Sequence, residues 1–292
     1  MRSVRPLLAA LLTVAAWGGG PLDAAAQSST TTGGAPVLLQ LRPKPGDLLH
    51  LRLDQTIEMG MTPRRFDDST KTDVTTLVML ARLTVESADV DGATVLAVAD
   101  SVRTESSGSY QSDVLRQARA LQGQRFRFRV SPDGSTAVTG VDAWAGPAVG
   151  SLLSQLPATL PAEPVAPGAT WNRSVDIPLA VSAEGKTTAT LTAVFRLDSI
   201  SRSGEFAYLS MKGRLVRSGP TQAGGAGGGG KRDGGFVQTS GSVTATLLLD
   251  RRRGWIADAR TIISLRSLVT GKEKDAAPLR VSMKITQWMR VM

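Results

Sequence analysis

The chain has 292 residues, no cysteine, one histidine and a formal net charge of +9. The lack of cysteine excludes disulfides, thiolate nucleophiles and sulfur-ligated metal sites, so that an oxygen-ligand metal site is the kind left to consider. The positive charge favours anionic partners, but the cations are mostly arginines spread along the whole chain, which is typical of a solvated surface.

The first residues follow the order of a secretory signal peptide. Two arginines precede an apolar run over 7–17, and three alanines end at Ala26. This run is about half of the roughly 20 residues that span a bilayer. We therefore expect a signal peptide over 1–26, a disordered linker over 27–36, no transmembrane segment in the mature chain, and a periplasmic or extracellular location.

Most of the remaining chain alternates between apolar and polar residues, as half-buried strands do. RFRFRV over 125–130 and LRVSMKIT over 279–286 are the clearest cases. Turn signals such as Asp91-Gly92, Pro132-Asp133-Gly134 and Ser203-Gly204 separate the runs. We predict about ten to twelve antiparallel strands.

Two segments have helical spacing. YQSDVLRQARALQG, over 110–123, carries apolar residues at steps of three and four and ends on a glycine. DAWAGPAVGSLLSQLPATLP, over 142–161, has Trp144 and Leu152 among apolar residues at steps of four. We expect each helix to lay its apolar side on a sheet.

The two halves of the mature chain resemble each other. TLVMLARL over 76–83 aligns without a gap on TLTAVFRL over 190–197, and the order of turns and strands around them is the same. We read this as an internal repeat. The predicted parts are a first β repeat over 37–143, a connecting helix and Pro-rich linker over 144–164, and a second β repeat over 165–292 with a flexible Gly-rich loop over 220–235.

The predicted fold is mainly β, with curved antiparallel sheets in two related halves, half-barrel or sandwich-like, and one or two short helices. A sheet with one apolar face must curl, stack or close to bury that face. A pair of curved sheets meets this need, and so does one continuous curled sheet around a helix. Either arrangement leaves room for an apolar groove.

The Gly-rich segment matches the first seven positions of the phosphate-binding pattern G-x-x-x-x-G-K at Gly225 to Lys231. The pattern needs a serine or threonine next and a helix after it. Here Arg232 follows, and the next segment is strand-like. We therefore expect no nucleotide site.

Catalytic and metal sites find little support in the sequence. His50 shares the outward side of its predicted strand with Arg52 and Asp54, so it is expected to be a solvated strand residue. The segment from Asp89 to Gly92 begins like a calcium loop but lacks the later acidic ligands, which favours a β-turn. We expect no enzyme activity, no catalytic residue, no metal and no cofactor.

Anionic partners and carboxylate chemistry remain alternatives. A stripe of Arg125, Arg127 and Arg129 has its aromatic neighbours on the opposite face, which does not favour nucleic acid, but adhesion to anionic surfaces through Arg-rich strands stays open. A hydrolase acting on envelope polymers through two carboxylates also stays open. Its exposed candidates are Asp67, Asp68, Glu86, Asp100 and Glu105, whereas local ion pairs account for Asp250 and Asp258.

The stretch LPATLPAEPVAPGATW over 156–171 resembles the signature of an uncharacterised family of exported bacterial proteins, a domain of unknown function often found in lipoproteins. The matching positions are Leu160-Pro161, Pro164-Val165, Pro167-Gly168 and Trp171. The resemblance implies neither an activity nor an assigned site, and this chain lacks the cysteine that a lipid anchor needs.

We therefore expect an exported, non-catalytic, β-rich protein whose partner is a lipid or another component of the cell envelope, with no nucleic acid bound. An apolar or amphiphilic ligand held against a curved sheet is the favoured hypothesis. Its candidate ligand-binding residues are Trp144, Leu152, Trp171 and Trp255.

Overall fold

The computed structural model describes residues 34–62, 71–107, 111–141, 159–179, 187–220, 236–270 and 279–292. Within these ranges it contains eleven strands and one helix. In chain order they are β1 (Leu48–Thr62), β2 (Lys71–Asp89), β3 (Gly92–Ser106), α1 (Gln111–Leu121), β4 (Arg125–Val130), β5 (Thr136–Val141), β6 (Thr170–Leu179), β7 (Thr187–Ile200), β8 (Phe206–Pro220), β9 (Phe236–Asp250), β10 (Trp255–Thr270) and β11 (Leu279–Val291).

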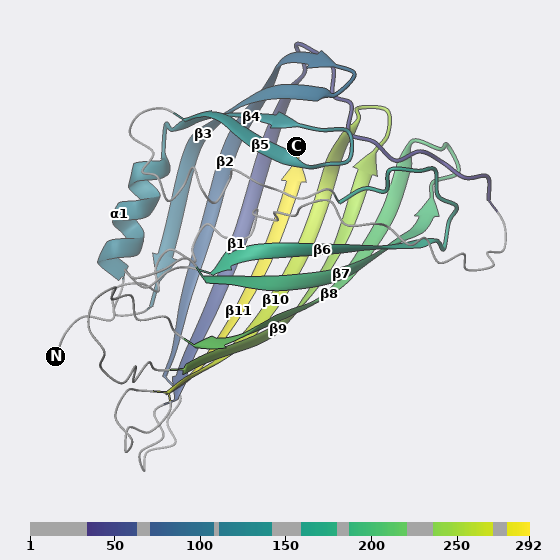
Figure 1. Cartoon of the computed structure of the whole chain (residues 1–292). Helices are drawn as coiled ribbons and strands as arrows, with labels where there is room; N and C mark the ends of the chain where they lie inside the picture. Colours follow the sequence, from purple (N-terminus) through teal and green to yellow (C-terminus); the bar gives the residue numbers. More distant parts are fainter. Residues whose placement is uncertain are drawn as a thin grey trace, which may run out of the picture.

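All eleven strands form one sheet of order β5-β4-β3-β2-β1-β11-β10-β9-β8-β7-β6. β1 to β5 and β6 to β10 are two antiparallel meanders, and β11 joins them because it pairs with β1 on one side and with β10 on the other. The described strands form one continuous sheet, so the predicted pair of sheets, with its sandwich-like alternative, is wrong, and the helix that the structure describes lies beside β3. The sheet is strongly curved, and its edge strands β5 and β6 both come round in front of the central strands (Figure 1).

The alternating runs form the predicted strands. In β4, Phe126 and Val130 are buried while Arg125 and Arg127 are exposed. β11 has the same alternation over its first half. The count of ten to twelve strands is confirmed, and the three quoted turn signals connect β2 to β3, β4 to β5 and β7 to β8.

The first predicted helix is confirmed as α1, which lies beside β3. It buries Ala118 and Leu121, and the amide of Gly123, just after its end, donates to the carbonyl of Ala99 in β3. The second predicted helix falls almost entirely on 142–158, outside the described residues. The predicted signal peptide and the Gly-rich loop over 221–235 also lie outside them.

The two faces of the sheet differ sharply. We call the face that carries Leu49, Leu83, Leu197 and Leu249 the inner face, because these buried side chains come from both meanders and belong to one core. The opposite face, which carries His50 and Arg52, is the outer face. The exposed position of His50 agrees with its predicted outward orientation.

Two chain segments fill the inner face near the turns between β2 and β3 and between β9 and β10. Leu39 and Leu41 come from the segment before β1, and Leu160 comes from the segment before β6; all three are buried in the core between the meanders. A bridge between Val37 and Val165 ties the two segments together. This core therefore lies at one end of the sheet, and a second cluster of buried side chains, which includes Phe195, Met211 and Val243, continues along the inner face of β7, β8 and β9.

Candidate functional site

The inner face changes character away from this core. Along the middle and opposite end of β1, β2, β10 and β11, Ile57, Leu77 and Ile285 are buried, but most of its other large apolar side chains are only half-buried. We call this set the methionine wall: Leu53, Met59, Met61, Met79, Leu265, Met283 and Met289. Five of the eight methionines of the chain belong to it.

Strand pairing gathers the wall residues into two groups. Leu53 lies opposite Met79 on β2 and opposite Met289 on β11, and Met59 lies opposite Met283. From Leu53 to Met61 the wall is roughly 26 Å long and, over four strands, roughly 14 Å wide. Unbranched, polarisable methionine side chains adapt to ligands of varied shape. The wall therefore suits an elongated apolar ligand.

A polar row crosses the wall between its two methionine groups. Gln55 on β1 is 4% exposed and lies opposite Gln287 on β11. Its Oε1 atom finds no hydrogen-bond donor among the described residues. A buried acceptor without a donor is unfavourable, typically by about 1–3 kcal/mol.

The two predicted ligand-binding residues that the structure describes, Trp171 and Trp255, lie outside the methionine wall. Trp171 is half-buried on β6, stacks on Phe195 at 5.8 Å between ring centroids and donates its indole N–H to the carbonyl of Thr159 at 3.0 Å. Trp255 is 9% exposed and belongs to the core. Trp144 and Leu152 lie outside the described residues, and neither tryptophan is part of the methionine wall.

The sequence reasoning missed the methionine wall. Its methionines do occupy the apolar positions of alternating runs, and that signal was available. The sequence did not show that these methionines lie side by side, because that depends on the pairing of β1 with β11, which are separated by most of the length of the chain.

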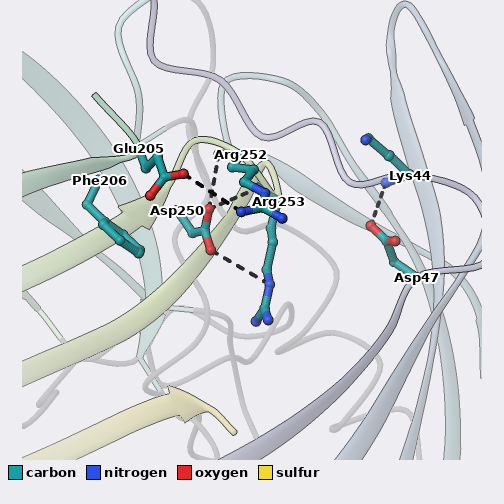
Figure 2. Close-up of a pocket in the computed structure, with 7 residues that line it drawn as sticks. All are labelled: Lys44, Asp47, Glu205, Phe206, Asp250, Arg252 and Arg253. Atoms are coloured by element: carbon teal, nitrogen blue, oxygen red, sulfur yellow. Dashed lines mark hydrogen bonds and ion pairs between the residues drawn. The ribbon is translucent and has the colours of Figure 1, made fainter. Parts of the chain in front are cut away.

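A cavity of about 350 Å³ lies among the turns at the core end of the sheet (Figure 2). Several of its charged groups are engaged with one another. Asp250 accepts the backbone N–H groups of Arg252 and Arg253, and Arg252 lies 3.8 Å from Glu205. Asp250 thus caps the β9–β10 turn, and the expected local ion pairs of Asp250 and Asp258 are present.

The carboxylate candidates do not converge on the inner face. Glu86 and Asp100 lie on the outer face, in ion pairs with Arg127 and Arg82 at 2.6 and 2.8 Å. The hydrogen bond from Arg127 holds the pKa of Glu86 below its ordinary value. Among strand carboxylates with described side chains, Asp73 alone faces inward, and it is 8% exposed. Asp67 and Asp68 lie outside the described residues.

The predicted arginine stripe of β4 is largely neutralised. Arg127 pairs with Glu86, and Arg129 pairs with Asp89 at 2.6 Å. The hydrogen bond from Arg129 holds the pKa of Asp89 below its ordinary value. This stripe is therefore a weak candidate for binding anions.

In the described ranges, no three histidine, aspartate or glutamate side chains come together as a metal site. No helix in that part of the chain is both long and apolar enough to cross a membrane.

No protein-family model matches the chain, and no curated protein matches it. The chain is similar to the solid-state NMR structure of outer membrane protein AlkL in DMPC lipid bilayers, at 7% identity and a TM-score of 0.15, over 91% of this chain and 96% of that one. It is also similar to the crystal structure of Pseudomonas aeruginosa OccK8 (OprE), at 7% identity and a TM-score of 0.19, over 86% and 100%. At these TM-scores the likeness carries no inference about fold or function.

Proposed function

We propose that the protein is an exported, non-catalytic component of the cell envelope that holds an apolar or amphiphilic ligand against the inner face of its curved sheet. The observation that carries this proposal is the methionine wall, which leaves seven large apolar side chains half-buried beside a filled core. Solvent contact with such a surface is unfavourable by roughly 25 cal/mol per Å² of apolar area.

The polar row narrows the class of ligand that fits the inner face. The half-buried carboxamide of Gln287, opposite the buried Gln55, favours a ligand that carries a hydrogen-bonding group, such as a hydroxyl or amide, beside its apolar part. An amphiphile meets both requirements, whereas a pure hydrocarbon leaves this carboxamide without a partner.

The half-barrel shape and the two related halves belong to the same proposal. Two details of the turns before β1 and β6 support the repeat. Gly46 donates to Val85, which donates to Asp47; Gly168 donates to Leu197, which donates to Ala169. The same pair of backbone hydrogen bonds therefore docks each meander's first strand onto its second.

We also propose that the chain belongs to the exported family whose signature its residues 156–171 resemble. The signature residues have structural roles that explain them without a catalytic site. Leu160 is 1% exposed in the core, Gly168 has a φ of 89°, and Trp171 stacks on Phe195. A φ in this range favours glycine.

Binding of the neutral fluorescent probe N-phenyl-1-naphthylamine tests the methionine wall. We expect saturable binding to the wild-type protein and about tenfold weaker binding after the double substitution Met79→Gln and Met289→Gln, because two carboxamides would then line the apolar surface. Both residues flank Leu53 in the wall. Fluorescence titration measures the change.

The matched control is Thr56→Gln with Thr286→Gln, which adds the same groups to facing positions on the outer face of β1 and β11. This variant should bind the probe like the wild type. Equal losses in both variants, or no saturable binding to the wild type, would contradict the proposal.

A further inference from the structure

A groove crosses the outer face, on the side of the sheet opposite the methionine wall. It has a volume of about 720 Å³ and runs over β2, β1, β11, β10, β9 and β8. A second hollow of about 540 Å³ adjoins it and shares Ser240, Arg266 and Ser282 with it. Across six strands the groove is roughly 24 Å wide, which suits an extended ligand better than a compact one.

Strand register gathers cations in this groove. Arg266 on β10 lies directly opposite Ser282 on β11. Arg280 and Lys284 lie two residues before and after Ser282, so all three point to the same face. Arg214 on β8 lines the other end of the groove. Four cationic side chains therefore line the two hollows, against one carboxylate, that of Glu58.

Among the described residues, the arginines of this groove have no acidic partner. Glu58 pairs with Lys284 at 3.2 Å. Within the described part of the chain, no ion pair involves Arg214, Arg266 or Arg280, whereas ion pairs are common elsewhere on the outer face, for example at Arg52, Arg82 and Arg127. Like charges on neighbouring strands repel each other. A bound anion would relieve this repulsion.

The rest of the lining narrows the class of anion. Exposed hydroxyl groups of Ser240, Ser242, Ser264 and Ser282 lie between the cations and can hydrogen-bond to hydroxyl or oxyanion oxygens. No aromatic residue is among the residues that line either hollow in the described chain, so the stacking platform typical of nucleic-acid binding is missing there. Of the apolar residues in the described lining, Val216 and Leu268 point to the outer face, and two such side chains do not favour insertion into a membrane.

We propose that this outer groove binds an acidic polysaccharide lying across β8 to β11 and β1. In this arrangement Arg214, Arg266 and Arg280 contact its carboxylate or other oxyanion groups, and the serines contact its hydroxyl groups. The two proposed sites lie on opposite faces of the sheet, and Leu265 and Met283 of the methionine wall also border the groove.

The test uses polygalacturonate as the probe, with neutral dextran, duplex DNA and phosphatidylglycerol vesicles measured at the same ionic strength. We expect polygalacturonate to bind most tightly and its binding to weaken as salt is added. The double substitution Arg266→Gln and Arg280→Gln should weaken binding by about tenfold or more, since each removes a charge-assisted contact. Calorimetric titration measures the affinity, and the circular dichroism spectrum checks folding.

The matched control is Arg119→Gln with Arg202→Gln, which removes the same charge at two exposed positions away from the groove. It should change the affinity by less than about twofold. An unchanged affinity in the groove variant, an equal loss in the control, or dextran binding as tightly as polygalacturonate would overturn the site. Tighter binding of DNA or of the vesicles would overturn the choice of a polysaccharide.

Discussion

Replacing Gly254 with alanine is expected to lower the free energy of unfolding by about 3 kcal/mol or more. Gly254 sits in the β9–β10 turn with a φ of 64°, and its carbonyl accepts the amide of Arg42 at 2.9 Å. An added Cβ would overlap the backbone of Arg42, whose carbonyl carbon would lie 2.5 Å away. The positive φ and the backbone overlap each contribute roughly 1–3 kcal/mol.

Gly46→Ala separates these two contributions. Gly46 has a φ of 86° but nothing within 4 Å of an added Cβ, so it carries the conformational cost alone. We expect a loss of about 1–2 kcal/mol for this variant. Urea denaturation of both variants gives the comparison, and equal losses would mean that the segment before β1 does not dock on the β9–β10 turn as described.

Phe195→Ala is expected to lower the free energy of unfolding by about 3–5 kcal/mol. Phe195 on β7 is 1% exposed and stacks on Trp171 with an angle of 9° between the rings. The substitution leaves a cavity beneath the indole ring and removes the ring contact. Equilibrium denaturation measures the loss, and tryptophan fluorescence reports the changed surroundings of Trp171.

The neighbouring residue supplies the control for Phe195. Val194 lies on the outer face of the same strand and is 45% exposed. Val194→Ala should change the free energy of unfolding by about 0.5 kcal/mol or less. A comparable loss in both variants would contradict the assignment of the inner face of β7 to the core.

The strands could be predicted from the sequence because one face packs on a core and the other meets water. Alternation therefore placed Phe126 inward and Arg125 outward correctly. Helix α1 was predictable for a similar reason, since its apolar spacing matches the side that meets β3. Both signals are local, extending over fewer than about twenty residues.

Long-range pairing could not be predicted in the same way. Alternation gives the face of Met59 and of Met283, but it does not give their register, which depends on β1 closing against β11. The same holds for Arg266 and Arg280, which are adjacent because β10 pairs with β11. Alternation also does not predict which segments cover the inner face. Around Trp255, this cover is supplied by Leu39 and Leu41.

Two opposite surfaces thus organise the molecule: an apolar inner wall and a basic, hydroxyl-lined outer groove. The ligand on the inner wall is the central claim, and mass spectrometry of the protein purified without detergent from cells that produce it naturally tests that claim most directly. A solvent extract should contain an amphiphile in near-stoichiometric amount, and the Met79→Gln and Met289→Gln variant should contain much less. An extract of the wild-type protein free of bound lipid would contradict the account.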